Sequence, residues 1–212
     1  MGTEHRGRIL APIGGCFLAS ALLLSSSALP ARDASAAALQ AARTRIAAAA
    51  RQADLAWPLT SPELRLFKAR RELELWAQGR RLRTYRVGLG AAPGEDKVRE
   101  GDHRTPAGRF FVCTRNRASA FHLFLGISYP HREAADRGLK AGLITRAQHR
   151  TILEALAQRR TPPQFTKLGG LIGIHGGGAG SDWTWGCIAL ADADIEELWE
   201  ACPLGTAVEV RD

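Results

Sequence analysis

The sequence predicts a mainly β domain that carries a helical insertion and is preceded by a helix. Apolar and polar residues alternate over residues 63–68, 72–76 and 82–89, which is typical of antiparallel strands with one solvent-facing side. Residues 132–159 have a helical composition and interrupt this series of strands. Residues 37–56 contain neither glycine nor proline and predict a separate helix near the N-terminus.

The N-terminal helix is the first predicted element of the folded part. Its small and apolar residues fall near helical spacing at Leu39, Ala42, Ile46, Ala50 and Ala53. Pro58 and Pro62 bracket a linker after it. Residues 37–57 are therefore interpreted as a helix and linker that space or pack against the domain over residues 63–211.

The remaining strands and one short helix follow a long polar loop at residues 94–108. Further strands are predicted at residues 109–113, 121–128, 171–175 and 207–210. The helical insertion between them is expected to border a groove. Residues 192–201 predict a short helix that Asp192 or Asp194 could cap, with its core-facing residues at Ile195, Leu198 and Trp199.

The first 31 residues have the organisation of a secretory signal peptide. Arg6 and Arg8 precede an apolar run over residues 9–24, and small residues follow it. A membrane anchor is disfavoured because the run is short and contains Pro12. A lipoprotein signal at Cys16 is disfavoured because the apolar run continues beyond that cysteine.

The signal peptide predicts an exported protein, periplasmic or associated with the cell wall. Cleavage after Ala28, Ala31 or Ala36 is compatible with the sequence. The formal net charge of +8 favours an anionic partner, although a solvated basic face explains it equally well. Because export argues against nucleic acid, an anionic envelope polymer or lipid surface fits this charge better.

Three cysteines remain once the signal peptide is removed: Cys113, Cys187 and Cys202. An odd number leaves at least one thiol without an internal partner. If Cys187 is catalytic, Cys113 and Cys202 form the only possible internal pair, and the sequence does not decide whether they are bonded. No cysteine or histidine spacing indicates a zinc site, and no metal or cofactor is expected.

The candidate active site is the glycine-rich stretch at residues 173–190. It contains His175 and Cys187, and a histidine within hydrogen-bond reach can convert a thiol into a nucleophilic thiolate. Bare backbone N–H groups between them could hold an oxyanion. The alternative is a buried cysteine beside an unrelated loop histidine.

Three segments, in this order, resemble the YkuD-type L,D-transpeptidase family. Lys-Val-Arg-Glu-Gly-Asp-His-Arg-Thr-Pro-Ala-Gly at residues 97–108 resembles that family's Gly-Asp and Thr-Pro loop. Ile-His-Gly at residues 174–176 is similar to its histidine strand end. Thr-Trp-Gly-Cys-Ile-Ala-Leu at residues 184–190, followed by Asp192, is similar to its nucleophile motif.

The resemblance implies a mixed-sheet sandwich or barrel of the L,D-transpeptidase type, with a cleft over the nucleophile. It implies that Cys187 attacks the carbonyl of an L-residue that precedes a D-residue in a peptidoglycan stem peptide. His175 is then the base. Backbone N–H groups of Gly186 and Cys187, with Trp185, are the candidate oxyanion hole.

Other residues are assigned supporting roles. A backbone carbonyl near Gly173 or the Ser181 hydroxyl is expected to orient the imidazole. The substrate-binding candidates are Trp185, Thr184, Tyr129 and His131.

Three positions depart from the family pattern and leave the second substrate open. Trp185 stands where many members have histidine, Ala189 where many have arginine, and Asp192 where asparagine is common. The alternative to a transpeptidase is a hydrolase of the same bond type, namely an L,D-carboxypeptidase, an endopeptidase or a wall-lipoprotein amidase. The alternative of another class is a non-catalytic peptidoglycan-binding module. A papain-like protease is disfavoured because there the cysteine precedes the histidine.

Overall fold

The computed structural model describes residues 31–212. The predicted signal peptide, apart from its last residue, lies outside the described residues. Among the helices from Ala31 onward, none is long and apolar enough to cross a membrane.

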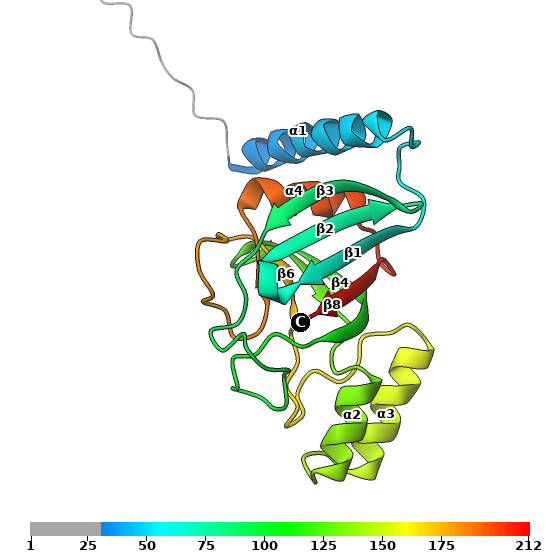
Figure 1. The fold of residues 1–212 in the computed structure, drawn as a ribbon, viewed down its shortest axis with the longest axis vertical. Coiled ribbons are helices and arrows are strands. Elements are labelled where there is room, and N and C mark those ends of the chain that lie inside the picture. The colour runs from blue at the N-terminus through cyan, green and yellow to red at the C-terminus, as the bar shows by residue number, and fades with distance from the viewer. Residues whose placement is uncertain (1–30) are drawn as a thin grey trace, which may run out of the picture.

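The domain is built on one curled, mixed sheet of eight strands (Figure 1). Their order is β3-β2-β1-β8-β4-β5-β6-β7, with β1 parallel to β8, β6 parallel to β7 and the other neighbours antiparallel. The strands are β1 (Pro62–Phe67), β2 (Glu72–Ala77), β3 (Arg80–Arg86), β4 (Gly108–Ser119), β5 (His122–Ile127), β6 (Gly173–His175), β7 (Ile188–Ala189) and β8 (Ala207–Arg211). The predicted mainly β, mixed-sheet fold is confirmed.

The alternation in the sequence separates the two faces of the sheet. In β1, Leu64 and Leu66 are buried, whereas Glu63 and Arg65 form an ion pair on the other side with 2.9 Å between Arg65 Nη2 and Glu63 Oε2. The solvent-facing side of β1 therefore places arginine beside a carboxylate.

Backbone bonds join the two ends of the sheet order. Gly88, just beyond β3, donates to the carbonyl of Ala189 in β7 at 2.9 Å and accepts from its N–H at 2.8 Å. Next to it, Thr184 N–H donates to the Leu89 carbonyl at 3.1 Å. The curl thus brings residues 88–91 against the loop that leads into β7.

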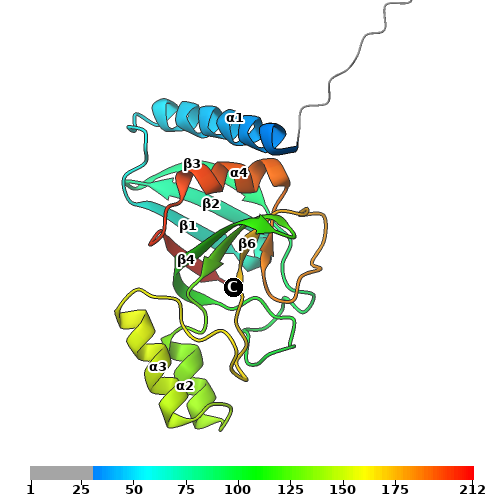
Figure 2. The same ribbon diagram turned by 180° about the vertical axis from the view of Figure 1, so that it is seen from behind.

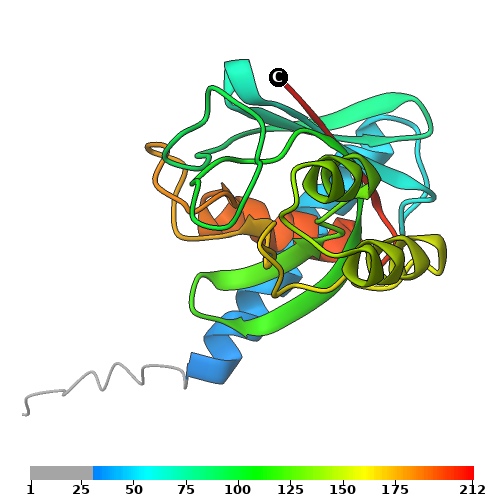
Figure 3. The same ribbon diagram turned by 90° about the horizontal axis from the view of Figure 1, so that it is seen from below.

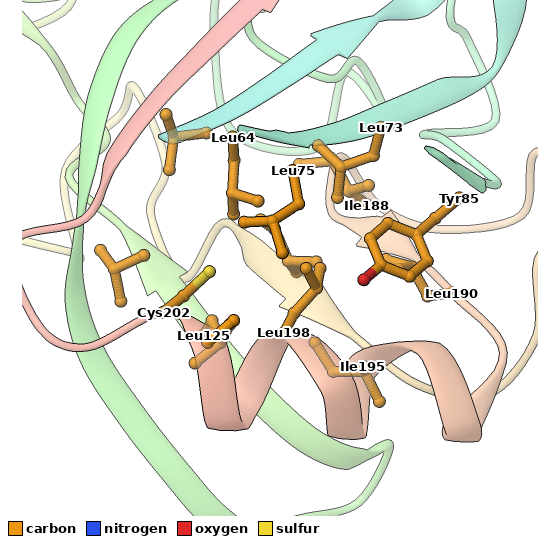
Figure 4. Close-up of a cluster of buried hydrophobic side chains, with 14 of the residues drawn as sticks. Leu64, Leu73, Leu75, Tyr85, Leu125, Ile188, Leu190, Ile195, Leu198 and Cys202 are labelled. Carbon is orange, nitrogen blue, oxygen red and sulfur yellow. The ribbon is translucent and has the colours of Figure 1, made fainter. Parts of the chain in front are cut away.

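The main core lies between the sheet and helix α4 (Asp192–Ala201), as Figure 4 shows with Leu64, Leu75 and Leu198. Ile195, Leu198 and Trp199 are buried as predicted. The predicted cap is wrong. The residue before the helix is Ala191, which makes no side-chain cap bond, and the Asp192 carboxylate accepts instead from Gly177 N–H at 2.8 Å.

Helix α1 (Ala31–Gln52) lies alongside α4 on the outside of the domain (Figures 1 and 2). Its buried residues include Leu39, Ala42, Ile46 and Ala50, as the helical spacing indicates. Arg45 Nε contacts Glu197 Oε1 of α4 at 2.7 Å. The N-terminal helix is therefore packed against the domain and is not only a spacer.

The helical insertion forms a hairpin of α2 (Arg132–Lys140) and α3 (Arg146–Ala157), which projects away from the sheet (Figures 1 and 3). A capping box at Thr145 and Gln148 starts α3. The hairpin has a small core of its own, made of Ala135, Ile144, Ile152 and Leu168.

Candidate active site

A cavity of about 530 Å³ opens beside the glycine-rich stretch. The loops before β4 and before β7, green and orange in Figure 3, lie on the same side of the molecule, and both contribute lining residues. The lining residues are Lys97, Glu100, Gly101, His103, Phe121, Gly170, Leu171, Ile172, His175, Trp183, Thr184, Trp185 and Cys187. The insertion α2–α3, which was expected to border a groove, contributes none of them.

The register of two parallel strands explains how His175 and Cys187 come to face one cavity. Ile174 in β6 pairs with Ile188 in β7, and both side chains are buried in the core. Because successive side chains in a strand point to opposite faces, His175 and Cys187 must both point away from that core. They line the cavity together.

The Cys187 thiol is half-buried and uncharged at rest. Its Sγ–H donates to the Leu171 carbonyl at 3.4 Å. Burial raises the pKa of the thiol above its usual 9.0, and a backbone hydrogen bond from Gly173 and the nearby Lys97 charge offset only part of this rise. Within the described residues, no hydrogen bond joins this sulfur to His175.

The His175 imidazole is held by its own neighbour. Its Nδ1 lies 2.7 Å from the Gly176 carbonyl, which can only accept, so Nδ1 carries the proton and Nε2 is left as the acceptor. Burial lowers the pKa of His175, and the Gly176 hydrogen bond offsets this only in part. The predicted orienting groups are therefore wrong: Ser181 is exposed, and Gly173 contacts the thiol instead.

Three aromatic rings surround the imidazole. The Phe121 ring stacks on His175 with 4.8 Å between centroids, and Phe124 lies parallel on a longer centroid distance of 6.4 Å. Trp183 meets the imidazole edge-on at 5.7 Å. Phe121 is brought here by the tip of the β4–β5 hairpin, where its carbonyl accepts from Gly176 N–H at 3.0 Å. This packing accounts for the burial of the imidazole.

The Thr184 hydroxyl fixes the turn that holds Cys187. It accepts from Gly186 N–H at 3.1 Å and donates to the Cys187 carbonyl at 2.7 Å. The hydroxyl predicted to bind substrate is thus used within the turn, although Thr184 does line the cavity. The Gly186 N–H is likewise occupied, whereas the N–H groups of Trp185 and Cys187 have no acceptor among residues 31–212.

The Gly-Asp and Thr-Pro loop supports this turn from behind. Gly186 has φ +124°, and a Cβ there would lie 2.6 Å from the Arg104 carbonyl, so no other residue fits without displacement. The Thr105 hydroxyl accepts from Gly90 N–H at 2.9 Å, next to the segment that binds the Thr184 backbone. The two motifs are therefore in direct contact, which explains their joint occurrence.

The aspartate of the same loop organises a buried charge. The Asp102 carboxylate accepts from the backbone N–H groups of Val98, Arg99 and Arg104 at 2.7–3.1 Å and from Lys97 Nζ at 2.8 Å. Burial would raise the pKa of Asp102, but these hydrogen bonds lower it below its ordinary value. Lys97 is buried and lines the cavity, a role that the sequence did not indicate.

A second ion pair ties the glycine-rich loop to the sheet. The Asp182 carboxylate accepts from Arg71 Nε at 3.1 Å, from Arg71 Nη2 at 2.7 Å and from Leu89 N–H at 2.9 Å. These bonds lower the pKa of Asp182 despite its partial burial. The loop between His175 and Cys187 is thus anchored near its middle.

Two predicted substrate-binding residues lie away from the cavity. Tyr129 is fully buried and its hydroxyl donates to the Leu168 carbonyl at 3.1 Å. His131 is 4% exposed and packs against Phe110, with 4.8 Å between ring centroids. Their expected place in the cleft is wrong because both side chains fill the interior. By contrast, Trp185 is 78% exposed at the cavity rim, 5.8 Å from the His103 ring.

The other two cysteines are not joined. Cys113 is half-buried, Cys202 is buried, and both are free. Among residues 31–212, no cluster of three or more His, Cys, Asp or Glu side chains is arranged to hold a metal ion.

Comparison with solved structures returns L,D-transpeptidases at low identity. An L,D-transpeptidase from Xylanimonas cellulosilytica is 18% identical with a TM-score of 0.41, over 72% of this chain and 61% of its own. L,D-transpeptidase 1 of Mycobacterium tuberculosis is 13% identical with a TM-score of 0.41, over 72% of this chain and 62% of its own. The helical cell shape determining protein Pgp2 of Campylobacter jejuni is 19% identical with a TM-score of 0.47, over 72% of this chain and 48% of its own. The chain thus spans less than two thirds of each of these proteins.

A search of curated protein sequences returned no match. A family profile matches most of the chain, over residues 64–210, and its description is YkuD, L,D-transpeptidase catalytic domain. This range contains all three motifs and the whole cavity lining. The chain therefore belongs to the YkuD family of L,D-transpeptidase catalytic domains.

Proposed function

We propose that the protein catalyses cysteine-dependent acyl transfer on peptidoglycan stem peptides, with Cys187 as nucleophile and His175 as base. The observation that carries this proposal is the placement of both side chains on one face of the β6–β7 pair, in one cavity. Membership of the L,D-transpeptidase family supports the same chemistry.

The reaction begins from a neutral thiol and a neutral imidazole. Nε2 of His175 takes the proton of the Cys187 thiol as the sulfur attacks the carbonyl carbon of the L-residue. The carbonyl oxygen becomes an oxyanion, for which the free N–H groups of Trp185 and Cys187 are the available donors. The imidazolium then protonates the amine of the departing D-residue, and a thioester on Cys187 remains.

The second half of the reaction depends on what attacks that thioester. An amine from another stem peptide gives a new crosslink, and water gives hydrolysis. In both cases His175 removes a proton from the attacking group and returns it to the sulfur when the thiol leaves.

Hydrolysis is the second candidate function, and one observation favours it. Ala189 occupies the position where many family members have arginine, and its side chain is fully buried in β7. The cavity therefore receives no cation from this position for an incoming anionic acceptor.

Incubation of the protein with defined muropeptides, followed by mass spectrometry, tests the proposal. A new crosslink supports the transpeptidase, and cleavage without any crosslink supports the hydrolase. Cys187→Ala is expected to abolish both while leaving the fold intact, since the hydrogen bonds of the thiol, to the Leu171 carbonyl at 3.4 Å and from the Gly173 backbone, are weak. Turnover that persists in this variant would refute a thioester mechanism.

A thiol-reactive carbapenem separates an enzyme from a non-catalytic wall-binding module. The enzyme is expected to acquire one covalent adduct on Cys187. Cys113→Ser is the matched control, because Cys113 is also half-buried but lies outside the cavity lining. Binding to peptidoglycan without any adduct on Cys187 supports the module.

We also infer export to the periplasm or cell wall, from the signal-like N-terminus. The basic arm, apolar run and small residues of the first 31 positions support this. Mass spectrometry of the mature N-terminus is expected to find cleavage after residue 28, 31 or 36. An intact N-terminus at Met1 contradicts cleavage.

A further inference from the structure

The lining of the cavity includes a lysine whose side chain is buried. The Lys97 side chain is only 3% exposed, yet it lines the same cavity as Cys187. A charge that is removed from water in this way requires hydrogen-bond partners. The positions of these partners show which of the ammonium N–H groups could still bind a ligand.

The protein supplies two acceptors for the three N–H donors of Lys97. Nζ donates to Asp102 Oδ1 at 2.8 Å and to the Arg99 carbonyl at 3.1 Å. Within the described residues it has no third acceptor. The Asp102 carboxylate also accepts hydrogen bonds from three backbone N–H groups, so its negative charge is not neutralised by Lys97 alone.

A carboxylate also lines the cavity and lies near the same glycine as Lys97. Glu100 is exposed, lines the cavity and forms no ion pair with any residue from 31 to 212. A Cβ on Gly169, where φ is +84°, would lie 2.5 Å from Glu100 Oε2 and 3.4 Å from Lys97 Cε. The backbone at Gly169 therefore lies close to both side chains. One ligand could contact both the Lys97 ammonium and the Glu100 carboxylate.

We propose that Lys97 binds a free α-carboxylate of the stem peptide and thereby selects the substrate. This inference rests on the proposed function, because it concerns the same cavity. A charge-assisted bond from a buried ammonium to a carboxylate is among the stronger hydrogen bonds in proteins. Ala189 supplies no competing cation, and Lys97 is the one Lys or Arg among the lining residues.

Two carboxylates of a stem peptide have this chemistry. One belongs to the departing D-residue, whose nitrogen is acylated and carries no charge. The other belongs to the side-chain centre of a diamino diacid at the acylating position, and it is accompanied by an ammonium group. Glu100 complements that ammonium, so it contributes only if the second source is the ligand.

The test compares three synthetic stem peptides on the wild-type protein: one with both carboxylates free, one with a carboxamide on the terminal D-residue, and one with a carboxamide on the diamino-acid side chain. One carboxamide is expected to lower kcat/KM by about tenfold or more, the range for a lost hydrogen bond to a charged group. Equal kcat/KM on all three peptides overturns the inference.

Lys97→Met is expected to remove this discrimination, and Lys97→Arg to retain it because the charge remains. A role limited to holding the loop would lower kcat/KM for all three peptides equally and keep their ratio. Lys167→Met is the matched control, since Lys167 is an exposed lysine outside the cavity. Discrimination that survives in Lys97→Met overturns the inference, and if this variant does not fold, the peptide series on the wild type decides.

Glu100→Gln separates the two sources. It is expected to weaken turnover of the free peptide if the side-chain centre is bound, and to leave it unchanged if the terminal carboxylate is bound. The inference can fail without the proposed function, as when all peptides are turned over equally. If no peptide is turned over and Cys187 is not acylated by any of them, the proposed function fails and the inference fails with it.

Discussion

Replacement of Thr184 by valine tests how the nucleophile is presented. Valine has nearly the same shape as threonine but has no hydroxyl, so the packing volume is kept and two hydrogen bonds are lost. These are the bonds of the Thr184 hydroxyl with Gly186 N–H at 3.1 Å and with the Cys187 carbonyl at 2.7 Å.

The expected cost follows from the burial of the two backbone groups. An unpaired buried polar group costs about 1–3 kcal/mol, and the Gly186 N–H is in this class. The Cys187 carbonyl is only partly buried, so its loss is expected at about 1 kcal/mol. The free energy of unfolding should therefore fall by about 2–4 kcal/mol, which leaves a domain of ordinary stability folded.

The assay pairs urea denaturation with the rate at which a carbapenem acylates Cys187. Thr184→Val is expected to slow acylation by about tenfold or more, because a shift of about 1 Å in the nucleophile can cost more than that. Thr184→Ser retains the hydroxyl and should restore most of the rate. Thr151→Val is the control, since this threonine is exposed and bonds only within α3. A Thr184→Val variant with wild-type stability and acylation rate would refute the reasoning.

Three further predictions concern ionisation. Phe121→Ala should expose His175, so the pKa of this histidine, which burial lowers, should rise toward 6.5. The acidic limb of the pH profile of kcat/KM should then shift to higher pH. An unchanged acidic limb contradicts the role of the Phe121 ring. Alkylation of Cys187 by iodoacetamide in the free protein should keep accelerating beyond pH 9.0, since burial raises the pKa of the thiol; a plateau near neutral pH would indicate a resting thiolate. Asp102→Asn should destabilise the protein by about 2 kcal/mol at pH 7 in urea denaturation. The pKa of Asp102 is lower in the folded protein than its ordinary value of 3.8, so the stability that Asp102 contributes is fully present above pH 3.8 and is lost as the pH falls through the folded pKa. The difference in the free energy of unfolding between the wild type and Asp102→Asn should therefore become smaller in acid.

Most strands were predictable because their side chains alternate between core and solvent. β1, β2 and β3 lie within one or a few residues of the predicted segments, and α4 agrees with residues 192–201. β4 was predicted to end at residue 113 but continues to Ser119. Beyond Thr114 the β4–β5 hairpin leaves the core and its register shifts, so the apolar alternation that marks a strand is absent.

The parallel pairings could not be derived from alternation. β8 enters between β1 and β4, and β7 joins β6, although in each case the paired strands are distant in the chain or very short. A two-residue strand has no periodicity to detect. Only the resemblance indicated a mixed sheet.

The residues of the candidate site were predictable where they belong to a sequence motif with known chemistry. They were not predictable where tertiary packing determines which side chains reach the cavity. His175 and Cys187 were identified by type and order. Tyr129 and His131 were expected to line the cleft, yet both are interior side chains. Phe121 and Lys97 were missed because nothing local distinguishes a ring that covers a histidine, or a lysine with a buried amine, from ordinary surface residues.

The two shifts of pKa in the site have one cause and one consequence. Burial disfavours whichever form is charged, so it raises the pKa of Cys187 and lowers that of His175. Both shifts therefore disfavour a thiolate–imidazolium pair. The neutral thiol donates a hydrogen bond to the Leu171 carbonyl. In the proposed mechanism, the thiolate therefore forms only when substrate is bound. The negative charge then passes from the sulfur to the carbonyl oxygen of the substrate. The resulting oxyanion can accept hydrogen bonds from the N–H groups of Trp185 and Cys187, which have no acceptor among residues 31–212. It follows that small thiol reagents, which offer no such oxyanion, should react with Cys187 far more slowly than acylating substrates do.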